Sequence, residues 1–146
     1  MPLDSFRDLS PLLNPKNIAV IGASERPGSA GRLVLENLRN LGFPGKIFPV
    51  NPTQQTVMGY PSYPDLKSLP EPVEMAAVLL GIDKVLPALK QGVENGLKAA
   101  WVLANCYAEA GAEGKIRQTE LARFAQETGL LICGPNCIGV ANLVDR

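Results

Sequence analysis

The 146-residue sequence contains no histidine, and only three of its residues are cysteine. Without histidine, the chain by itself can form neither a Ser-His-Asp nor a Cys-His nucleophilic site, and no zinc site with histidine ligands. The cysteines, Cys106, Cys133 and Cys137, include no C-x-x-C pair and supply too few ligands for zinc. We therefore expect reduced thiols that are mostly buried, no metal site and no catalytic residue. The protein is expected to act by binding.

The sequence also lacks an excess of charge, since 14 Lys and Arg residues balance 14 Asp and Glu residues. A neutral chain without basic runs carries no electrostatic signature of nucleic-acid or anionic-membrane binding. No apolar run approaches the roughly 20 residues of a membrane-spanning helix. Residues 1–6 lack the basic and then apolar layout of a signal peptide. We expect a cytoplasmic protein that contacts neither nucleic acid nor membrane.

Short apolar runs alternate with longer helical patterns along the chain. Runs without polar alternation predict strands that are buried on both faces, and they occupy residues 17–22, 46–50, 75–80, 99–103 and 130–133. Helical patterns occupy residues 29–41, 83–95 and 113–128. This alternation predicts the α/β class: a doubly wound, mainly parallel, Rossmann-like sheet of about five or more strands. Residues 1–146 are expected to form a single domain.

Residues 51–72 contain five prolines, which predicts an irregular excursion across the surface. Asp83 is predicted to cap the second helix. The helical periodicity also predicts which side chains face the core. These are Val34, Leu35, Leu38 and Leu41 in the first helix, Val85, Leu86, Leu89 and Val93 in the second, and Ile116, Leu121, Phe124 and Ala125 in the last.

A loop rich in small residues, 22–31, connects the first predicted strand to the first predicted helix. Small residues let the backbone approach a ligand, and a helix start offers free N–H groups and the positive end of its dipole. Serine hydroxyls and arginines add donors and positive charge. We predict a phosphate or pyrophosphate site here; the alternative is a tight turn in which Ser29 is only an N-cap. The candidate residues are Gly22, Ser24, Arg26, Gly28, Ser29 and Gly31.

The spacing of this loop disfavours two common nucleotide motifs. Glycines at 22, 28 and 31 do not match G-x-G-x-x-G, and no Lys-Ser or Lys-Thr follows Gly28 as in an ATP-binding P-loop. After the second predicted strand, Asn51 and Pro52 stand where an NAD site has a carboxylate for the ribose. A phosphorylated ribose fits better, because this position lacks the carboxylate that would repel the phosphate.

Several motifs occur in a characteristic order along nearly the whole chain. They span residues 14–24, 28–31, 43–52, 59–66, 108–111 and 134–139, and the last, Gly-Pro-Asn-Cys-x-Gly, is the most specific. Together they resemble the N-terminal CoA-binding domain of the NDP-forming acyl-CoA synthetases, which are relatives of the succinyl-CoA synthetase α subunit.

The resemblance implies coenzyme A as the ligand, with its nucleotide end in the glycine-rich loop and its pantetheine arm across the strand ends. By position, Ser24, Gly28 and Ser29 match the phosphate-holding loop of the family. The resemblance places Asn51 and Pro52 near the ribose, and the turn at 134–137 near the reaction site. It also implies that the segment after the fourth strand borders CoA. This segment contains Asn105, Cys106 and Tyr107.

Ligases of this family move phosphate through a histidine in a second domain. The resemblance therefore implies that this chain is a fragment or module that binds CoA or acyl-CoA without turnover of its own. It would work with a downstream phosphohistidine domain or a partner subunit. Two hypotheses remain beside it. One is the CoA-binding module of a protein acetyltransferase or a stand-alone CoA-binding protein; the other is an NAD(P)-binding oxidoreductase domain, in which Arg26 or Arg32 would tolerate NADP.

Overall fold

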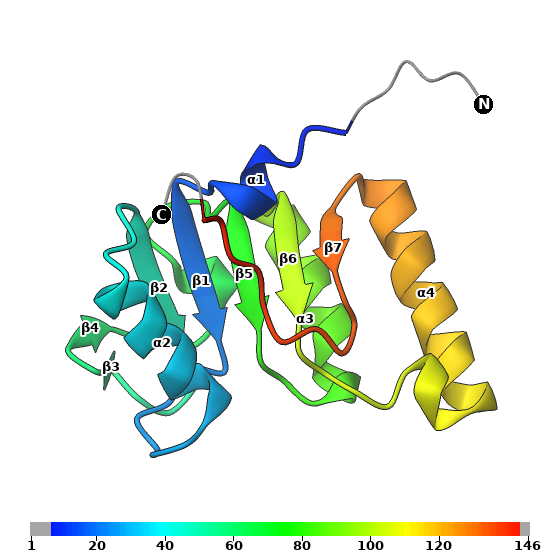
Figure 1. The fold of residues 1–146 in the computed structure, drawn as a ribbon, viewed down its shortest axis with the longest axis horizontal. Helices are drawn as coiled ribbons and strands as arrows, with labels where there is room; N and C mark the ends of the chain where they lie inside the picture. The colour runs from blue at the N-terminus through cyan, green and yellow to red at the C-terminus, as the bar shows by residue number, and fades with distance from the viewer. Residues whose placement is uncertain (1–6, 144–146) are drawn as a thin grey trace.

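The computed structural model describes residues 7–143 and contains a five-stranded parallel sheet in the order β2-β1-β5-β6-β7 (Figure 1). Residues 1–6, whose sequence predicts no signal peptide, and residues 144–146 lie outside the described part. The predicted α/β class and the parallel sheet are confirmed. Each of the five predicted strands is present: β1 (Asn17–Ile21), β2 (Lys46–Val50), β5 (Met75–Val78), β6 (Ala99–Val102) and β7 (Leu131–Cys133).

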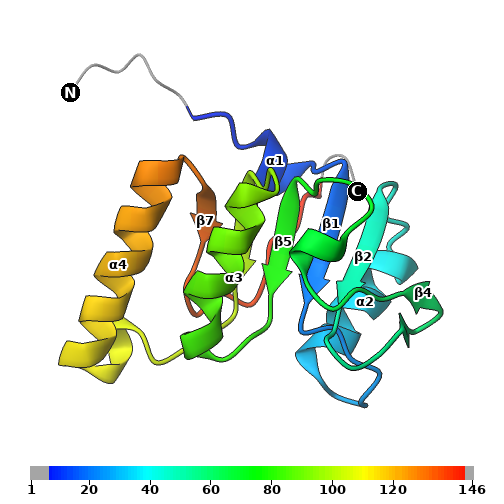
Figure 2. The ribbon, with the colours of Figure 1, turned by 180° about the vertical axis from the view of Figure 1, so that it is seen from behind.

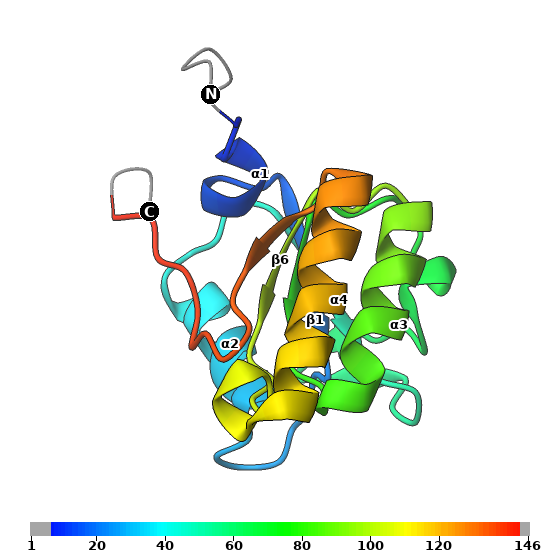
Figure 3. The same ribbon diagram turned by 90° about the vertical axis from the view of Figure 1, so that its right-hand side faces the viewer.

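Helices cover both faces of this sheet. Helix α2 (Ala30–Asn40) lies on one face, whereas α3 (Ile82–Glu94) and α4 (Ala112–Thr128) lie on the other (Figures 2 and 3). The chain runs from β1 through α2 to β2, and then crosses to β5 on the other side of β1. The strand order therefore reverses at β1. Over residues 7–143, three shorter helices are also present: α1 (Ser10–Leu13), η1 (Leu66–Ser68) and η2 (Ala108–Ala110).

The prediction of an irregular excursion over residues 51–72 is wrong for its central part. A two-stranded antiparallel hairpin, β3 (Thr56–Val57) and β4 (Tyr60–Pro61), interrupts it. Met58 and Gly59 form the turn with φ values of 52° and 84°, as in the type I′ turns that join tight hairpins. Strands of two residues are too short to show a period, which is why the sequence pattern does not reveal them.

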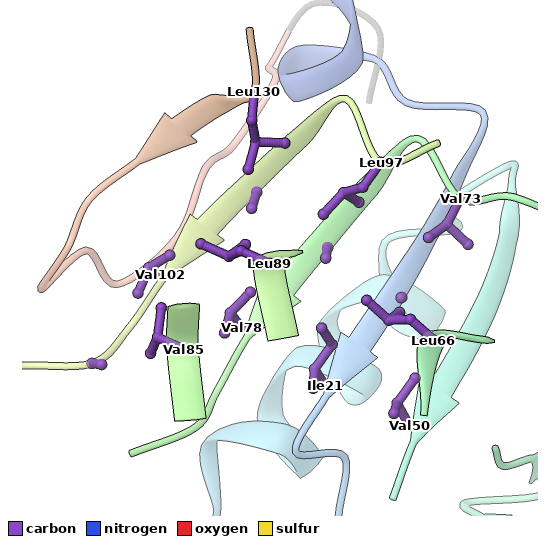
Figure 4. Packing of buried hydrophobic residues seen from close by; sticks show 14 of the residues in the cluster. Ile21, Val50, Leu66, Val73, Val78, Val85, Leu89, Leu97, Val102 and Leu130 are labelled. Atoms are coloured by element: carbon purple, nitrogen blue, oxygen red, sulfur yellow. The ribbon is translucent and has the colours of Figure 1, made fainter. Parts of the chain in front are cut away.

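The core on the α3–α4 face is built from alternating strand residues and the inner sides of the helices (Figure 4). Val78 and Val102 of the sheet lie in one buried cluster with Val85 and Leu89 of α3. On the opposite face, Trp101 is 6% exposed and belongs to a second buried cluster. Both faces of each central strand are thus buried, which explains their continuous apolar runs.

Three predictions about the helices are wrong. Leu41, the C-cap of α2, is 76% exposed because it lies about 120° around the helix from the buried Leu35 at 3.6 residues per turn. Ile116 is 62% exposed, because it lies about 140° around α4 from the buried Leu121 at 3.6 residues per turn. Asp83 stands in the first turn of α3, where Gly81 is the N-cap and no side chain caps the helix.

A polar cluster ties the amino ends of the strands together. The Asn17 side chain, 7% exposed, donates to Glu71 Oε1 and to the Pro72 carbonyl, both at 3.0 Å, and accepts from the Glu74 amide at 2.8 Å. The Glu74 carboxylate accepts from the Lys16 amide at 3.0 Å and from Lys98 Nζ at 3.1 Å. The hydrogen bond from the Lys16 backbone N–H, and after it the hydrogen bond from the Lys98 ammonium, holds the pKa of Glu74 below its usual value.

We expect the free energy of unfolding to separate two positions of α4. Leu121→Ala removes a buried side chain and should cost about 2–5 kcal/mol. Ile116→Ala on the exposed side should change stability by less than about 0.5 kcal/mol. Urea unfolding of both variants measures the difference, and equal losses would contradict the assigned orientation of α4.

The pH dependence of stability should report on Glu74. Its pKa is lower in the folded state than the ordinary 4.5, so its contribution is present above pH 4.5 and is lost as the pH falls through the folded-state pKa. Glu74→Gln should therefore flatten the loss of stability below pH 4.5. Glu120→Gln, at an exposed position, is the control and should keep the wild-type slope. An unchanged slope in the Glu74 variant would refute this assignment.

Candidate functional site

Five loops gather at the carboxyl edge of the sheet, because all its strands are parallel and end on the same side (Figure 1). They follow β1, β2, β5, β6 and β7 in turn. The loop that follows β1, residues 22–29, leads directly into α2 at the strand where the order reverses. In open α/β sheets this reversal is where ligands bind. The sequence-predicted site residues therefore lie at one edge of the fold.

Gly31 allows α2 to lie directly against the end of β1, and Gly22 allows the end of β1 to lie against the residue that follows β5. Gly22 has a φ of +89°, and a Cβ added there would lie 2.5 Å from the Leu79 carbonyl oxygen. A Cβ added at Gly31 would lie 2.2 Å from the Gly22 carbonyl oxygen. Neither position can hold a side chain without a shift of the backbone. The first and last glycines of the predicted loop thus have a packing role, which brings the start of α2 close to the sheet.

The two serines of the loop shape its backbone. Ser29 is the N-cap of α2: its Oγ accepts from the Arg32 amide at 3.3 Å and donates to the Arg26 carbonyl at 2.8 Å. Ser24 Oγ accepts from the Arg26 amide at 3.1 Å. The N-cap role that the sequence left open for Ser29 is present in the structure. Each hydroxyl oxygen has a further hydrogen-bonding capacity that these bonds do not use.

The arginines of this region differ in their availability. Arg32 donates from Nε to Glu36 at 2.7 Å and from a terminal nitrogen to the Glu25 carbonyl at 2.9 Å. The Arg26 side chain is exposed and has no hydrogen bond or ion pair with residues 7–143. Arg26 is therefore the cation of the loop that is available to an anionic ligand. Gly28, two residues later, has a φ of +75° and open space around it.

Asn51 holds the loop after β2 against the loop after β1. Its Nδ2 donates to the Ala23 carbonyl at 2.8 Å and to Gln54 Oε1 at 3.1 Å. Its Oδ1 accepts from the amides of Thr53 at 2.9 Å and Gln54 at 3.1 Å. The side chain is thus used to position the two loops, while the neighbouring Pro52 is exposed.

Glu25 is a structural residue of the site that sequence reasoning missed. Its Oε1 accepts from the Met58 amide at 2.6 Å, which pins the turn of the β3–β4 hairpin to the glycine-rich loop. The two residues are 33 positions apart, and no local pattern in the sequence signals their contact. This bond and the packing of the buried Val57 against Val20 and Ala23 hold the hairpin beside the loop.

The three predicted residues after β6 have different surroundings. Asn105 and Cys106 are exposed, and Cys106 has a φ of +68°. Tyr107 is only 2% exposed and belongs to the core, and this burial raises the pKa of its hydroxyl. Asn105 and Cys106 thus present their side chains to solvent at the edge, whereas Tyr107 anchors the segment.

The turn after β7 is joined to this same segment. The Asn136 amide donates to the Ala104 carbonyl at 2.9 Å, and the Cys137 amide donates to the Val102 carbonyl at 3.1 Å. The structure therefore brings the Gly-Pro-Asn-Cys turn beside the end of β6, as a continuous backbone surface next to Asn105.

A separate hollow of about 420 Å³ lies between α3 and α4, on the face opposite α2. Arg117 crosses it, in ion pairs with Asp83 of α3 and Glu113 of α4. Over residues 7–143, no three His, Cys, Asp or Glu side chains cluster in a way that could hold a metal ion. In the same part of the chain, no helix is both long and apolar enough to cross a membrane.

Comparison with known proteins identifies close relatives of this chain. The sequence model of the CoA binding domain matches residues 16–142. An ADP-forming acetate–CoA ligase of Archaeoglobus fulgidus is 36% identical over 131 residues, which are 90% of this chain and 19% of the ligase. The chain spans about a fifth of the length of the first curated relatives that it matches.

Two solved structures extend the comparison. A dinucleotide-forming acetyl-coenzyme A synthetase of Candidatus Korarchaeum cryptofilum, in complex with phosphate and ADP, superimposes with a TM-score of 0.83 at 38% identity. That match covers 88% of this chain and 27% of the synthetase. A conserved hypothetical protein of Pyrococcus furiosus is 28% identical with a TM-score of 0.65, and the match covers 84% of this chain and 96% of that protein.

Substitution of Asn51 should test its positioning role. Asn51→Asp replaces the donor to the Ala23 carbonyl with a carboxylate oxygen, and should cost about 1–3 kcal/mol of stability. Asn105→Asp makes the same chemical change at an exposed position and should cost less than about 0.5 kcal/mol. Thermal unfolding compares the two variants, and an Asn51 variant as stable as the Asn105 variant would rule out this role.

Proposed function

Because the chain belongs to the CoA binding domain family, we propose that it binds coenzyme A at the carboxyl edge of its sheet. The match of the family across residues 16–142 carries this proposal, since it includes all the loops of that edge. The ligand is CoA or an acyl-CoA. In this role CoA is a substrate that binds and leaves, and the residues present at the edge fit a molecule with phosphate groups at one end.

The glycine-rich loop is the proposed site of the nucleotide end. Its backbone approaches the ligand where Gly28 has open space around it, and α2 directs the positive end of its dipole to the same place. The Arg26 guanidinium, which has no ion pair with residues 7–143, supplies a charge for a phosphate group. Pro52 is exposed beside the loop and offers a surface for the ribose. Residues 51–54, which follow β2 directly, include no acidic side chain that would repel a phosphorylated ribose.

The pantetheine arm is proposed to run from β1 across the end of β5 toward β6. Neighbouring strands lie about 4.8 Å apart, so the end of β6 is roughly 10 Å from that of β1. A long, flexible arm can span this distance. It would then reach Asn105 and Cys106, which are exposed there, and the backbone of the Gly-Pro-Asn-Cys turn beyond them.

The whole protein is proposed to be an NDP-forming acyl-CoA ligase, with residues 1–146 as its CoA-binding domain. The similarity to the Archaeoglobus ligase and to the Korarchaeum synthetase supports this assignment. The chain contains no histidine, so a phosphohistidine would have to come from another domain or a partner subunit. The chain alone would hold CoA without turnover, in the cytoplasm where CoA and nucleotides are available.

A stand-alone CoA-binding protein is the second candidate. The Pyrococcus protein of similar fold is matched over 96% of its length, so this domain type also makes up nearly all of some chains. Both candidates require CoA binding, and they differ in what the coding frame contains after residue 146. A histidine-bearing ligase domain there would support the first candidate, and a stop codon would support the second.

Calorimetric titration should give saturable binding of CoA and no binding of NAD. Ser29→Asp should weaken CoA binding by about tenfold or more, corresponding to about 1.4 kcal/mol, because it places a negative charge beside the phosphate groups. Aspartate is itself a good N-cap, so α2 should still form. Asn37→Asp adds the same charge at an exposed position two turns along α2 and should leave the affinity unchanged.

Absence of heat with CoA and with acyl-CoA would contradict the proposal. Binding of NADPH that CoA does not displace would instead favour the oxidoreductase hypothesis.

A further inference from the structure

Two of the three cysteines lie together beside the carboxyl edge. Cys133 is the last residue of β7, and the chain then turns back through residues 134–136 and returns across the sheet (Figure 1). The Cys133 and Cys137 sulfur atoms are 3.5 Å apart, and each side chain is half-buried. Their thiols contact each other, although Cys133 belongs to the sheet and Cys137 to the turn that follows it.

Backbone bonds hold both cysteines in place. Cys133 is opposite Trp101 in the register of β6 and β7, and the Cys137 amide donates to the Val102 carbonyl at 3.1 Å. Formation of a disulfide, about 2.05 Å long, requires the sulfur atoms to approach by about 1.5 Å. Small rotations of two side chains that already face each other can supply such a movement.

We propose that Cys133 and Cys137 form a reversible dithiol–disulfide couple that reacts with small disulfides. This couple depends on the positions of the two sulfur atoms and is independent of CoA as the ligand. It is a modification site in the turn that the pantetheine arm is proposed to reach, and its formation does not require CoA. It differs from Cys106, which is exposed on the neighbouring loop and has its sulfur 3.4 Å from Asn105 Oδ1.

The reaction proceeds in two exchange steps. The thiolate of one cysteine attacks a sulfur of the small disulfide, a mixed disulfide forms, and one small thiolate leaves. The other cysteine then attacks the protein sulfur of the mixed disulfide, the intramolecular bond forms and the second small thiolate leaves. The two protein thiols lose two protons and two electrons in total. The small disulfide accepts the electrons and becomes two thiols.

Oxidation should stiffen the part of the edge that joins β6 to β7. A disulfide between Cys133 and Cys137 closes a covalent ring around the turn. A hydrogen bond from the Asn136 N–H to the Ala104 carbonyl connects this turn to the end of β6. Asn105 and Cys106 follow directly. Burial, together with the Cys137 contact, raises the pKa of the Cys133 thiol, so the exchange should become faster as the pH rises above neutrality.

The test uses the full chain with oxidised glutathione as the probe. After incubation and alkylation, peptide mapping by mass spectrometry should show a 133–137 disulfide in the wild-type protein and a glutathione adduct or an alkylated thiol at Cys106. Dithiothreitol should restore three alkylatable thiols. Since Trp101 lies beside Cys133 in the sheet and is the single tryptophan, its fluorescence should change with oxidation and recover with reduction.

Two variants provide the controls. Cys106→Ser should lose both remaining thiols on oxidation without any adduct, and its mass should fall by two hydrogens. Cys133→Ser combined with Cys106→Ser should keep glutathione attached at Cys137, because no second protein thiol remains to displace it. The proposal is overturned if Cys133 and Cys137 both remain alkylatable while Cys106 reacts fully, or if they pair between two chains instead of within one.

Discussion

The close approach of α2 to the end of β1 is the constraint on which the site depends. It exists because Gly31 and Gly22 lack side chains where their backbones meet each other and the end of β5. With α2 held there, its first turn lies at the carboxyl edge, and Arg26 and Gly28 of the connecting loop are exposed. The same contact places the helix start at the strand where the sheet order reverses.

Side-chain and backbone hydrogen bonds then connect the loops of the edge to each other. Asn51 joins the loop after β2 to the loop after β1, and Glu25 joins that loop to the hairpin. Asn136 joins the turn after β7 to the end of β6. Each bond links segments far apart in the sequence, so the edge behaves as one connected surface. At the opposite edge, Asn17 makes the corresponding connections.

Much of the fold could be predicted because its signals are local. A strand buried on both faces must be continuously apolar, and the five strands of the sheet were found on this basis, with β2 predicted at its observed bounds. The periodicity of α4 was visible, but its phase was not: Ile116 and Leu121 are both apolar, and only packing against the sheet shows which one is buried. The hairpin was missed because two-residue strands have no period. The glycine-rich loop lies between β1 and α2 as predicted, whereas the bond of Glu25 to the hairpin could not be predicted, since its partner is distant in sequence.

The sequence by itself determined the α/β class, the order of its elements and the family, because apolar runs, glycine spacing and the Gly-Pro-Asn-Cys motif are properties of adjacent residues. Only the tertiary structure shows which candidate residues are hydrogen-bonded, which are buried and which are exposed to a ligand. Asn51 is used in joining loops, Tyr107 is buried in the core, and Arg26 is left available. It also brought two half-buried thiols within 3.5 Å of each other. These outcomes depend on contacts between segments that only the folded chain brings together.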